Sequence, residues 1–137
     1  MKLGVYNAIL HDRPLPEALK VIADLGLTGI EINTGGFLPA VHVPTFDEIL
    51  ESDAARDDYL EIFEGTGVSI AGLNCNGNPL HPKREIGEKH AEDIRRSIRL
   101  AHRLGQDPEG RLPALQGPPR PSPASRPSAP RSWRRPG

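Results

Sequence analysis

The chain has little cysteine and few aromatic residues. Of its 137 residues one is cysteine, and Phe, Trp and Tyr together make up 4%. The single thiol, Cys75, cannot form an internal disulfide, and its place beside an apolar run predicts an inert, partly buried side chain rather than a nucleophile. A chain without disulfides is typical of a reducing compartment, so we expect a cytoplasmic protein.

Long hydrophobic runs are also missing. No apolar segment approaches the roughly 20 residues that a helix needs to cross a bilayer. The first ten residues carry one lysine, and their apolar stretch is broken by Asn7 and followed by His11, Asp12 and Arg13, which does not match a cleaved secretion signal. The sequence therefore predicts no membrane partner.

The formal charge of −1 hides two segments of opposite sign. Residues 1–105 contain 11 Lys and Arg against 16 Asp and Glu, a balance of −5, whereas residues 106–137 contain 6 arginines against 2 acidic residues, a balance of +4. An acidic body does not fit a nucleic acid as partner, because binding to phosphates depends on basic patches. We therefore divide the chain into a body, residues 1–106, and a tail, residues 107–137.

The tail has a biased composition. It includes 9 prolines and 6 arginines, and it contains no Ile, Val, Phe, Tyr, Lys, Asn or Thr. Such a segment cannot build a core, and proline lacks the backbone donor of a central strand, so we expect a disordered Pro/Arg-rich tail. A composition of mainly Pro, Arg, Ala, Ser and Gly is what a GC-rich gene gives when it is translated out of frame. We interpret the tail as a frameshift product rather than as a Pro-rich ligand or a basic arm.

Three short apolar runs in the body have strand character. They cover residues 2–7, 28–33 and 68–74, and each is followed by polar, Gly- or Pro-containing residues and then by a helical pattern. A strand followed by a helix, three times in succession, predicts an α/β fold with a parallel sheet.

The helices between these strands are marked by end signals and apolar periodicity. Residues 15–23 carry one apolar stripe, and Gly26 suits the position after the helix end. Thr45 can cap a second helix, which is expected to break near Ser52. The third helix, residues 85–104, is expected to bury the stripe formed by Ala91, Ile94, Ile98 and Ala101.

Polar and apolar residues alternate at the end of the second run. Ile30 and Ile32 point to one face of the strand, and Glu31 and Asn33 point to the other. Strands covered by helices on both faces tend to be apolar throughout, so a polar face favours a barrel, whose lumen carries the chemistry at the C-terminal strand ends. The expected fold class is α/β, an incomplete TIM (β/α)8 barrel of the first three β/α units with a disordered C-terminal tail.

The loops after the three strands gather groups that bind polar ligands. Each loop carries one histidine, His11, His42 or His81. With the strand-end carboxylate and amides, these loops would suit a polyhydroxylated or phosphorylated ligand. His11 is interpreted as a solvent-exposed or capping residue, and His90 and His102, on the third helix, are expected at the surface. The predicted substrate-binding residues are Glu31, Asn33, His42, Asn74, Asn76, Asn78 and His81.

Several stretches of the body resemble the sugar phosphate isomerase/epimerase family. They are MKLGVYNAIL, GIEINTGGF, VHVP and especially CNGNPLHP, and the likeness runs in order through residues 1–106. This family of xylose-isomerase-like TIM barrels includes inosose dehydratase-like and tagatose-epimerase-like enzymes. The chain resembles its N-terminal portion, although the position of Asn76 is commonly a histidine in the family.

The resemblance implies metal-dependent isomerisation or epimerisation of a sugar or sugar phosphate. A divalent metal, Mn²⁺, Mg²⁺ or Zn²⁺, would polarise a carbonyl and a hydroxyl while carboxylates move a proton on the adjacent carbon. In the family the metal ligands come from the second half of the barrel. We therefore expect this chain to be an inactive fragment that binds no metal and supplies substrate contacts, with no catalytic residue identified.

Two other functions stay open at this point. Endonuclease IV-like DNA repair enzymes are similar in fold and use loop histidines as zinc ligands, a role that His42 and His81 could mimic. The balance of −5 in the body argues against this DNA partner. The other alternative is a non-enzymatic fragment that is stabilised by docking its open sheet edge on a partner.

Overall fold

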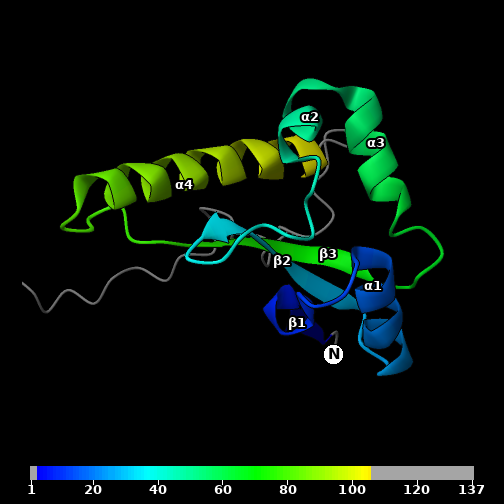
Figure 1. The fold of residues 1–137 in the computed structure, drawn as a ribbon. Helices are drawn as coiled ribbons and strands as arrows, with labels where there is room; N and C mark the ends of the chain where they lie inside the picture. The colour runs from blue at the N-terminus through cyan, green and yellow to red at the C-terminus, as the bar shows by residue number, and fades with distance from the viewer. Residues whose placement is uncertain (1–2, 106–137) are drawn as a thin grey trace, which may run out of the picture.

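A computed structural model of the chain describes residues 3–105 (Figure 1). The tail, with its predicted disorder and its interpretation as a frameshift product, lies outside the described residues. Strands and helices follow one another in the order β1 (Gly4–Tyr6), the 3-10 helix η1 (Asn7–Leu10), α1 (Leu15–Asp24), β2 (Gly29–Gly36), α2 (Phe46–Glu51), α3 (Asp53–Glu61), β3 (Ser69–Asn76) and α4 (Arg84–Gly105).

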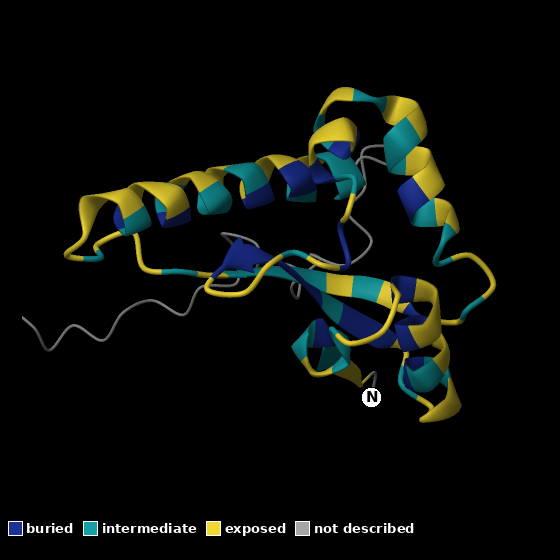
Figure 2. Cartoon of the chain, viewed as in Figure 1, coloured by how far each residue is buried: buried dark blue, intermediate teal, exposed yellow. Residues whose placement is uncertain are grey.

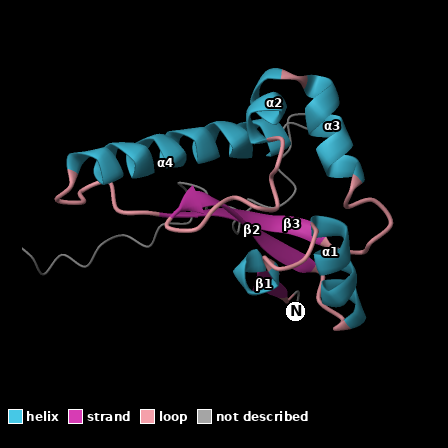
Figure 3. Ribbon diagram, in the orientation of Figure 1, coloured by secondary structure: helices cyan, strands magenta, loops and turns pink. Residues whose placement is uncertain are grey.

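The described strands form one parallel sheet in the order β1-β2-β3 (Figure 3). β1 pairs with β2 from Gly4–Gly29 to Tyr6–Glu31. β2 therefore extends beyond β1, and its C-terminal end pairs with β3 alone, up to Gly36 and Asn76. Cys75 in β3 is a partly buried free thiol, as the sequence predicts.

One cluster of buried apolar side chains joins the sheet to the helices. Ile30 and Ile32 of β2 are fully buried, and Leu19 of α1, Ile49 of α2 and Leu100 of α4 belong to the same cluster. Figure 2 shows that the buried residues of α4 lie on its side toward the sheet. Full burial of an aliphatic side chain contributes about 1.5–3 kcal/mol, so this cluster is the main force that assembles the domain.

The first helix and the break in the second agree with their predictions. α1 starts at Leu15, and Ser52 separates α2 from α3, where its Oγ accepts a hydrogen bond from the backbone N–H of Ala55 at 3.3 Å. The prediction that Thr45 caps the second helix is wrong, because its side chain makes no capping hydrogen bond. The capping role belongs to Ser52, at the break itself.

The last turn of α4 connects to both short helices. The Nε of Arg103 donates to the backbone carbonyl of Ile49 in α2 at 3.1 Å, and a terminal nitrogen of the same guanidinium lies 2.8 Å from a carboxylate oxygen of Asp53 in α3. One side chain of α4 thus bridges the break at Ser52.

The predicted buried stripe of α4 is correct only in part, since Ala91, Ile94 and Ala101 are half-buried. Ile98, expected inside, is 65% exposed, and the residues that α4 buries are Gly87, His90, Ser97 and Leu100. The helix is rotated about its axis relative to the prediction. The side chains of Ser97 and Asp93, on its inner side, hydrogen-bond to residues at the end of β2. Neither α4 nor any other helix within residues 3–105 has the length and hydropathy of a membrane span.

The predicted incomplete TIM barrel is also wrong. Within residues 3–105 the chain forms a small α/β domain, with a three-stranded parallel sheet and four α-helices, and this arrangement does not indicate part of a barrel. The prediction depended on the polar face of β2 at Glu31 and Asn33. The Asn33 side chain bonds to Tyr6 and to carbonyl oxygens of the following loop, and one carboxylate oxygen of Glu31 accepts from Asn74, so both residues have partners within the domain without a barrel lumen.

Candidate functional site

One face of the sheet carries four polar side chains from three adjacent strands. We call them the polar row, and they are Tyr6 of β1, Glu31 and Asn33 of β2, and Asn74 of β3. The strand register pairs Tyr6 with Glu31 and Asn33 with Asn74. Because side chains alternate along a strand, the row lies on the face opposite Ile32 and the apolar core.

The outer part of the row presents groups for a ligand. The Nδ2 of Asn74 donates to the Oε1 of Glu31 at 3.2 Å, and no described residue donates to Oε2. Burial raises the pKa of the Tyr6 phenol, and the charge of Glu31 adds to this, so the phenol keeps its proton at neutral pH. A carboxylate, an amide and a phenol, each partly exposed, thus lie on neighbouring strands.

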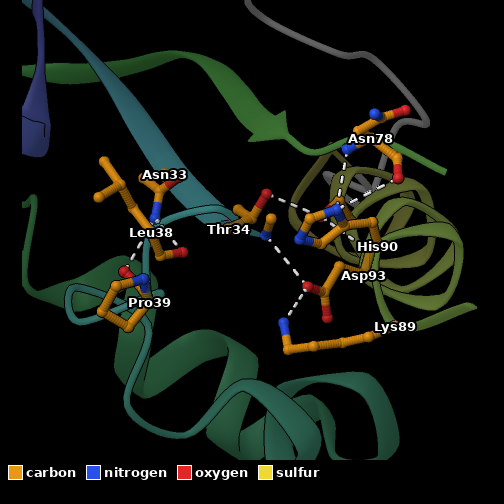
Figure 4. Close-up of polar contacts among 10 residues, drawn as sticks. Asn33, Thr34, Leu38, Pro39, Asn78, Lys89, His90 and Asp93 are labelled. Carbon is orange, nitrogen blue, oxygen red and sulfur yellow. Dashed lines mark hydrogen bonds and ion pairs between the residues drawn. The ribbon is translucent and has the colours of Figure 1, made fainter. Parts of the chain in front are cut away.

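The inner part of the row is Asn33, which is fully buried. Its Oδ1 accepts a hydrogen bond from the Tyr6 hydroxyl at 3.1 Å. Its Nδ2 donates to the carbonyl oxygens of Leu38 at 3.2 Å and Pro39 at 2.8 Å, as Figure 4 shows. Both amide hydrogens are therefore used inside the protein, and the role of Asn33 is to hold the loop after β2 and to orient Tyr6.

His42 lies beneath this loop and is bonded through both ring nitrogens. The Oδ1 of Asn7 accepts from the backbone N–H of Asn33 at 2.8 Å, which fixes the amide so that its Nδ2 donates to His42 Nδ1 at 2.9 Å. His42 Nε2 then carries the proton and donates to the carbonyl oxygen of Arg13 at 2.9 Å. Both ring nitrogens of His42 are therefore engaged, and zinc ligation by His42 would require breaking one of these bonds.

His11 packs edge to face against His42, with ring centroids 5.3 Å apart. Its Nε2 is buried and has no hydrogen-bond partner among the described residues. Burial lowers the pKa of His11, and the neighbouring His42 ring lowers it further. The folded protein therefore favours the neutral form of His11.

This preference predicts a loss of stability in mild acid. The unfolded chain has a His11 pKa near the usual value of about 6.5, so it binds a proton before the folded chain does. We expect the free energy of unfolding to fall as the pH drops from about 7 toward 5, and to fall less in a His11→Gln variant. Urea titrations at several pH values measure both curves. The curves should be parallel above about pH 7.5, and equal slopes below pH 7 would contradict the assignment.

The other predicted residues shape the loop between β3 and α4. The carbonyl oxygen of Asn76 accepts from the backbone N–H of Phe37 at 2.8 Å. The backbone N–H of Asn78 donates to the Nδ1 of His90 at 2.9 Å, and the Nδ1 of His81 accepts from the backbone N–H two residues later at 3.1 Å. Within the described residues none of the three predicted side chains is hydrogen-bonded to the polar row.

The sequence reasoning missed Tyr6 and Asn7 as members of the site. One signal could have found Asn7, because each of the three strand-like runs ends in asparagine, at Asn7, Asn33 and Asn74. Three such ends in a parallel sheet meet at one edge, where amides can bond to one another. Tyr6 had no comparable signal, since an aromatic residue in a strand is ordinary.

The prediction that His90 lies at the surface is wrong. It is 4% exposed, and its ring packs edge to face on Phe37 with centroids 4.8 Å apart. Gly77 makes room for it, because a Cβ at that position would come within 2.9 Å of the His90 ring. The histidine therefore joins the loops after β2 and β3.

The metal implied by the family resemblance does not fit this part of the chain. Within residues 3–105 no three His, Cys, Asp or Glu side chains gather closely enough to hold a metal ion. Glu31 has an amide as its partner, and His42 has both ring nitrogens bonded. We therefore derive no catalytic step through a metal.

Comparison with known proteins identifies a bacterial relative of this chain. No family model matches the chain, and no solved structure matches it. The chain is 35% identical over 105 residues to a Bacillus subtilis protein described as "Uncharacterized protein YfiH". The match covers 77% of this chain and 33% of the relative, so the chain spans about a third of the length of the protein it resembles.

Proposed function

We propose that this chain is the sugar-binding part of an enzyme that isomerises or epimerises a sugar or sugar phosphate. The observation that carries the proposal is the polar row, in which a half-buried carboxylate with an unbonded oxygen lies beside an amide and a phenol. Sugar hydroxyls donate and accept hydrogen bonds, and this set of groups offers both. The stretches that resemble the isomerase/epimerase family contain Tyr6, Glu31 and Asn33, which supports the same class of ligand.

Each outer residue of the row has a distinct task in this proposal. The free Oε2 of Glu31 accepts a hydrogen bond from a sugar hydroxyl, and the negative charge strengthens that bond. Asn74 keeps the carboxylate in place through its bond to Oε1. Tyr6, held by Asn33, offers its phenol oxygen to a second hydroxyl. These residues bind and orient the sugar, and we expect residues 3–105 alone to leave it unconverted.

The test is a titration of the chain with hexoses, pentoses and their phosphates, followed by NMR and calorimetry. We expect saturable binding that shifts the amide signals of β1, β2 and β3 around the row. Glu31→Gln should weaken binding about tenfold, because a charged acceptor is replaced by a neutral one of the same size. An assay with Mn²⁺, Mg²⁺ or Zn²⁺ should show no turnover by this chain.

Glu64→Gln is the matched control, because Glu64 is exposed and follows α3, away from the row. It should bind each sugar as the unmodified chain does. Neutral sugars belong in the panel because their binding does not depend on a phosphate group. Failure of every sugar to bind, or equal losses in the two variants, would contradict the proposal.

A further inference from the structure

A cavity lies on the face of the sheet opposite the polar row. It has a volume of about 400 Å³, within the range of small-ligand pockets, and it lies between the end of β2, the loop that follows it and α4. Thr34 lines the cavity and points toward α4, because its Oγ1 is 2.8 Å from the Oγ of Ser97 in that helix. Since Thr34 follows Asn33 in the strand, its side chain points away from the polar row. We call this space the β2–α4 cavity.

Two glycines at the end of β2 shape the wall of the cavity. Gly35 and Gly36 have φ angles of 138° and 88°, a region that favours glycine. The backbone N–H of Gly36 points to the α4 side, where it donates to the Oδ2 of Asp93 at 3.1 Å. The wall therefore offers a backbone donor that already holds a carboxylate oxygen.

Two positively charged side chains of α4, Lys89 and Arg96, line the same cavity. The ammonium of Lys89 lies 2.6 Å from the Oδ2 of Asp93, as Figure 4 shows. Burial opposes the ionisation of Asp93, but the hydrogen bonds from Lys89 and Gly36 and the charges of Lys89 and Arg96 outweigh it, so the pKa of Asp93 is lowered. This corner of the cavity therefore stabilises a negatively charged oxygen.

The charges lining the cavity do not cancel. Lys89 and Arg96 contribute two positive charges against the one negative charge of Asp93. Arg96 also pairs with Asp47, but that carboxylate is 80% exposed and screened by water, so the pair is weak. The Arg96 guanidinium is held over the Phe46 ring, 4.6 Å from its centroid, and stays at the cavity.

We propose that the β2–α4 cavity binds the phosphate group of a small ligand between Lys89, Arg96 and the N–H of Gly36, in competition with the Asp93 carboxylate. The carboxylate occupies this position in the ligand-free protein through the same two donors that a phosphate oxygen would use. Phe37 and Leu38, 62% and 43% exposed, border the cavity and would contact the carbon part of a phosphate monoester. This site does not rest on the proposed sugar-binding role of the polar row.

The experiment is an NMR titration of the full chain at constant ionic strength, with inorganic phosphate, a hexose phosphate and the neutral hexose as separate ligands. Both phosphates should shift the amide signals of Gly35 and Gly36 in a saturable way, and the neutral hexose should not. Tighter binding of the hexose phosphate would identify a monoester as the ligand, whereas equal affinities would identify free phosphate. A residue-specific signal separates this site from the arginines of the tail.

Two substitutions test the competition. Asp93→Asn should tighten phosphate binding about tenfold, because the internal anion is removed, and Lys89→Met should weaken it about tenfold. The matched controls are Asp24→Asn and Lys20→Met in α1, where the same pair of residue types is spaced i,i+4 with 2.7 Å between the charged atoms. The controls should leave the affinity unchanged.

The outcomes that would overturn the proposal are distinct from those of the sugar titration. Absence of a saturable shift at Gly36, or an equal shift when chloride replaces phosphate, would exclude the site. Weaker binding in Asp93→Asn would exclude the competition. If a variant does not fold, the amide shift of Gly36 in the unmodified chain still shows whether phosphate binds at this site. Sugar binding at Glu31 with no phosphate effect at Gly36 would refute this inference alone.

Discussion

Replacing Gly36 by alanine is expected to lower the free energy of unfolding by about 3–5 kcal/mol. An alanine Cβ at this position would lie 2.2 Å from the carbonyl oxygen of Asn76, an atom of the neighbouring strand backbone. That oxygen cannot retreat without disturbing its hydrogen bond from Phe37 and the pairing of β2 with β3. The φ of 88° adds the usual cost of about 1–2 kcal/mol for a side chain in the left-handed region.

Gly26→Ala is the control that separates the two causes. Gly26 has a φ of 74°, but a Cβ there would have no heavy atom within 4 Å. Its substitution should therefore cost about 1–2 kcal/mol, the conformational part alone. Guanidinium titrations of both variants give the difference, which measures the close approach of the two strands. Equal losses would show that β2 and β3 are not in contact at Gly36.

Asn7→Ala is expected to lower the free energy of unfolding by about 2–4 kcal/mol. The substitution leaves two buried groups without partners, the backbone N–H of Asn33 and the Nδ1 of His42. Each unsatisfied buried polar group costs about 1–3 kcal/mol, and both Asn33 and His42 are buried. Urea unfolding followed by circular dichroism measures the change.

Asn76→Ala serves as the control for Asn7→Ala. Asn76 is exposed, and the bond it makes within the domain uses its backbone carbonyl, which alanine keeps. Its substitution should change the free energy of unfolding by about 0.5 kcal/mol or less. If both asparagines gave small effects, the network of Asn7, Asn33 and His42 would not be part of the stable fold.

Local patterns in the sequence were enough to predict most elements. The periodicity of α1, the break at Ser52 and the three strand-like runs depend on neighbouring residues, and the structure confirms them. The alternation of Ile30, Glu31, Ile32 and Asn33 also correctly separates the apolar face from the polar one. Each of these patterns depends on a few neighbouring residues, so it can be recognised in a single sequence.

The errors concern contacts between segments that are distant in the sequence. The apolar stripe predicts one orientation of α4, but Ser97 and Asp93 find partners at Thr34 and Gly36, and a partly polar side of the helix therefore faces inward. His90 is buried for the same reason, through its contact with the loop after β2.

The barrel was a mistake of the same kind. The polar face of β2 favours a lumen in the sequence, but hydrogen bonds to residues far along the chain engage this face within the domain. Such networks cannot be anticipated from hydropathy, because buried asparagine and histidine look like surface residues until their partners are known.

The bridge from Arg103 to both short helices has a consequence for cooperativity. α2 has six residues and α3 has nine, lengths at which an isolated helix is marginal in water. Core packing of Ile49 and Tyr59 stabilises these helices, and Arg103 adds contacts from the C-terminal turn of α4 to Ile49 on one side of the break and to Asp53 on the other. We therefore expect local opening of α4 to weaken α2 and α3 as well, so that the amide hydrogens of the three helices exchange at similar rates.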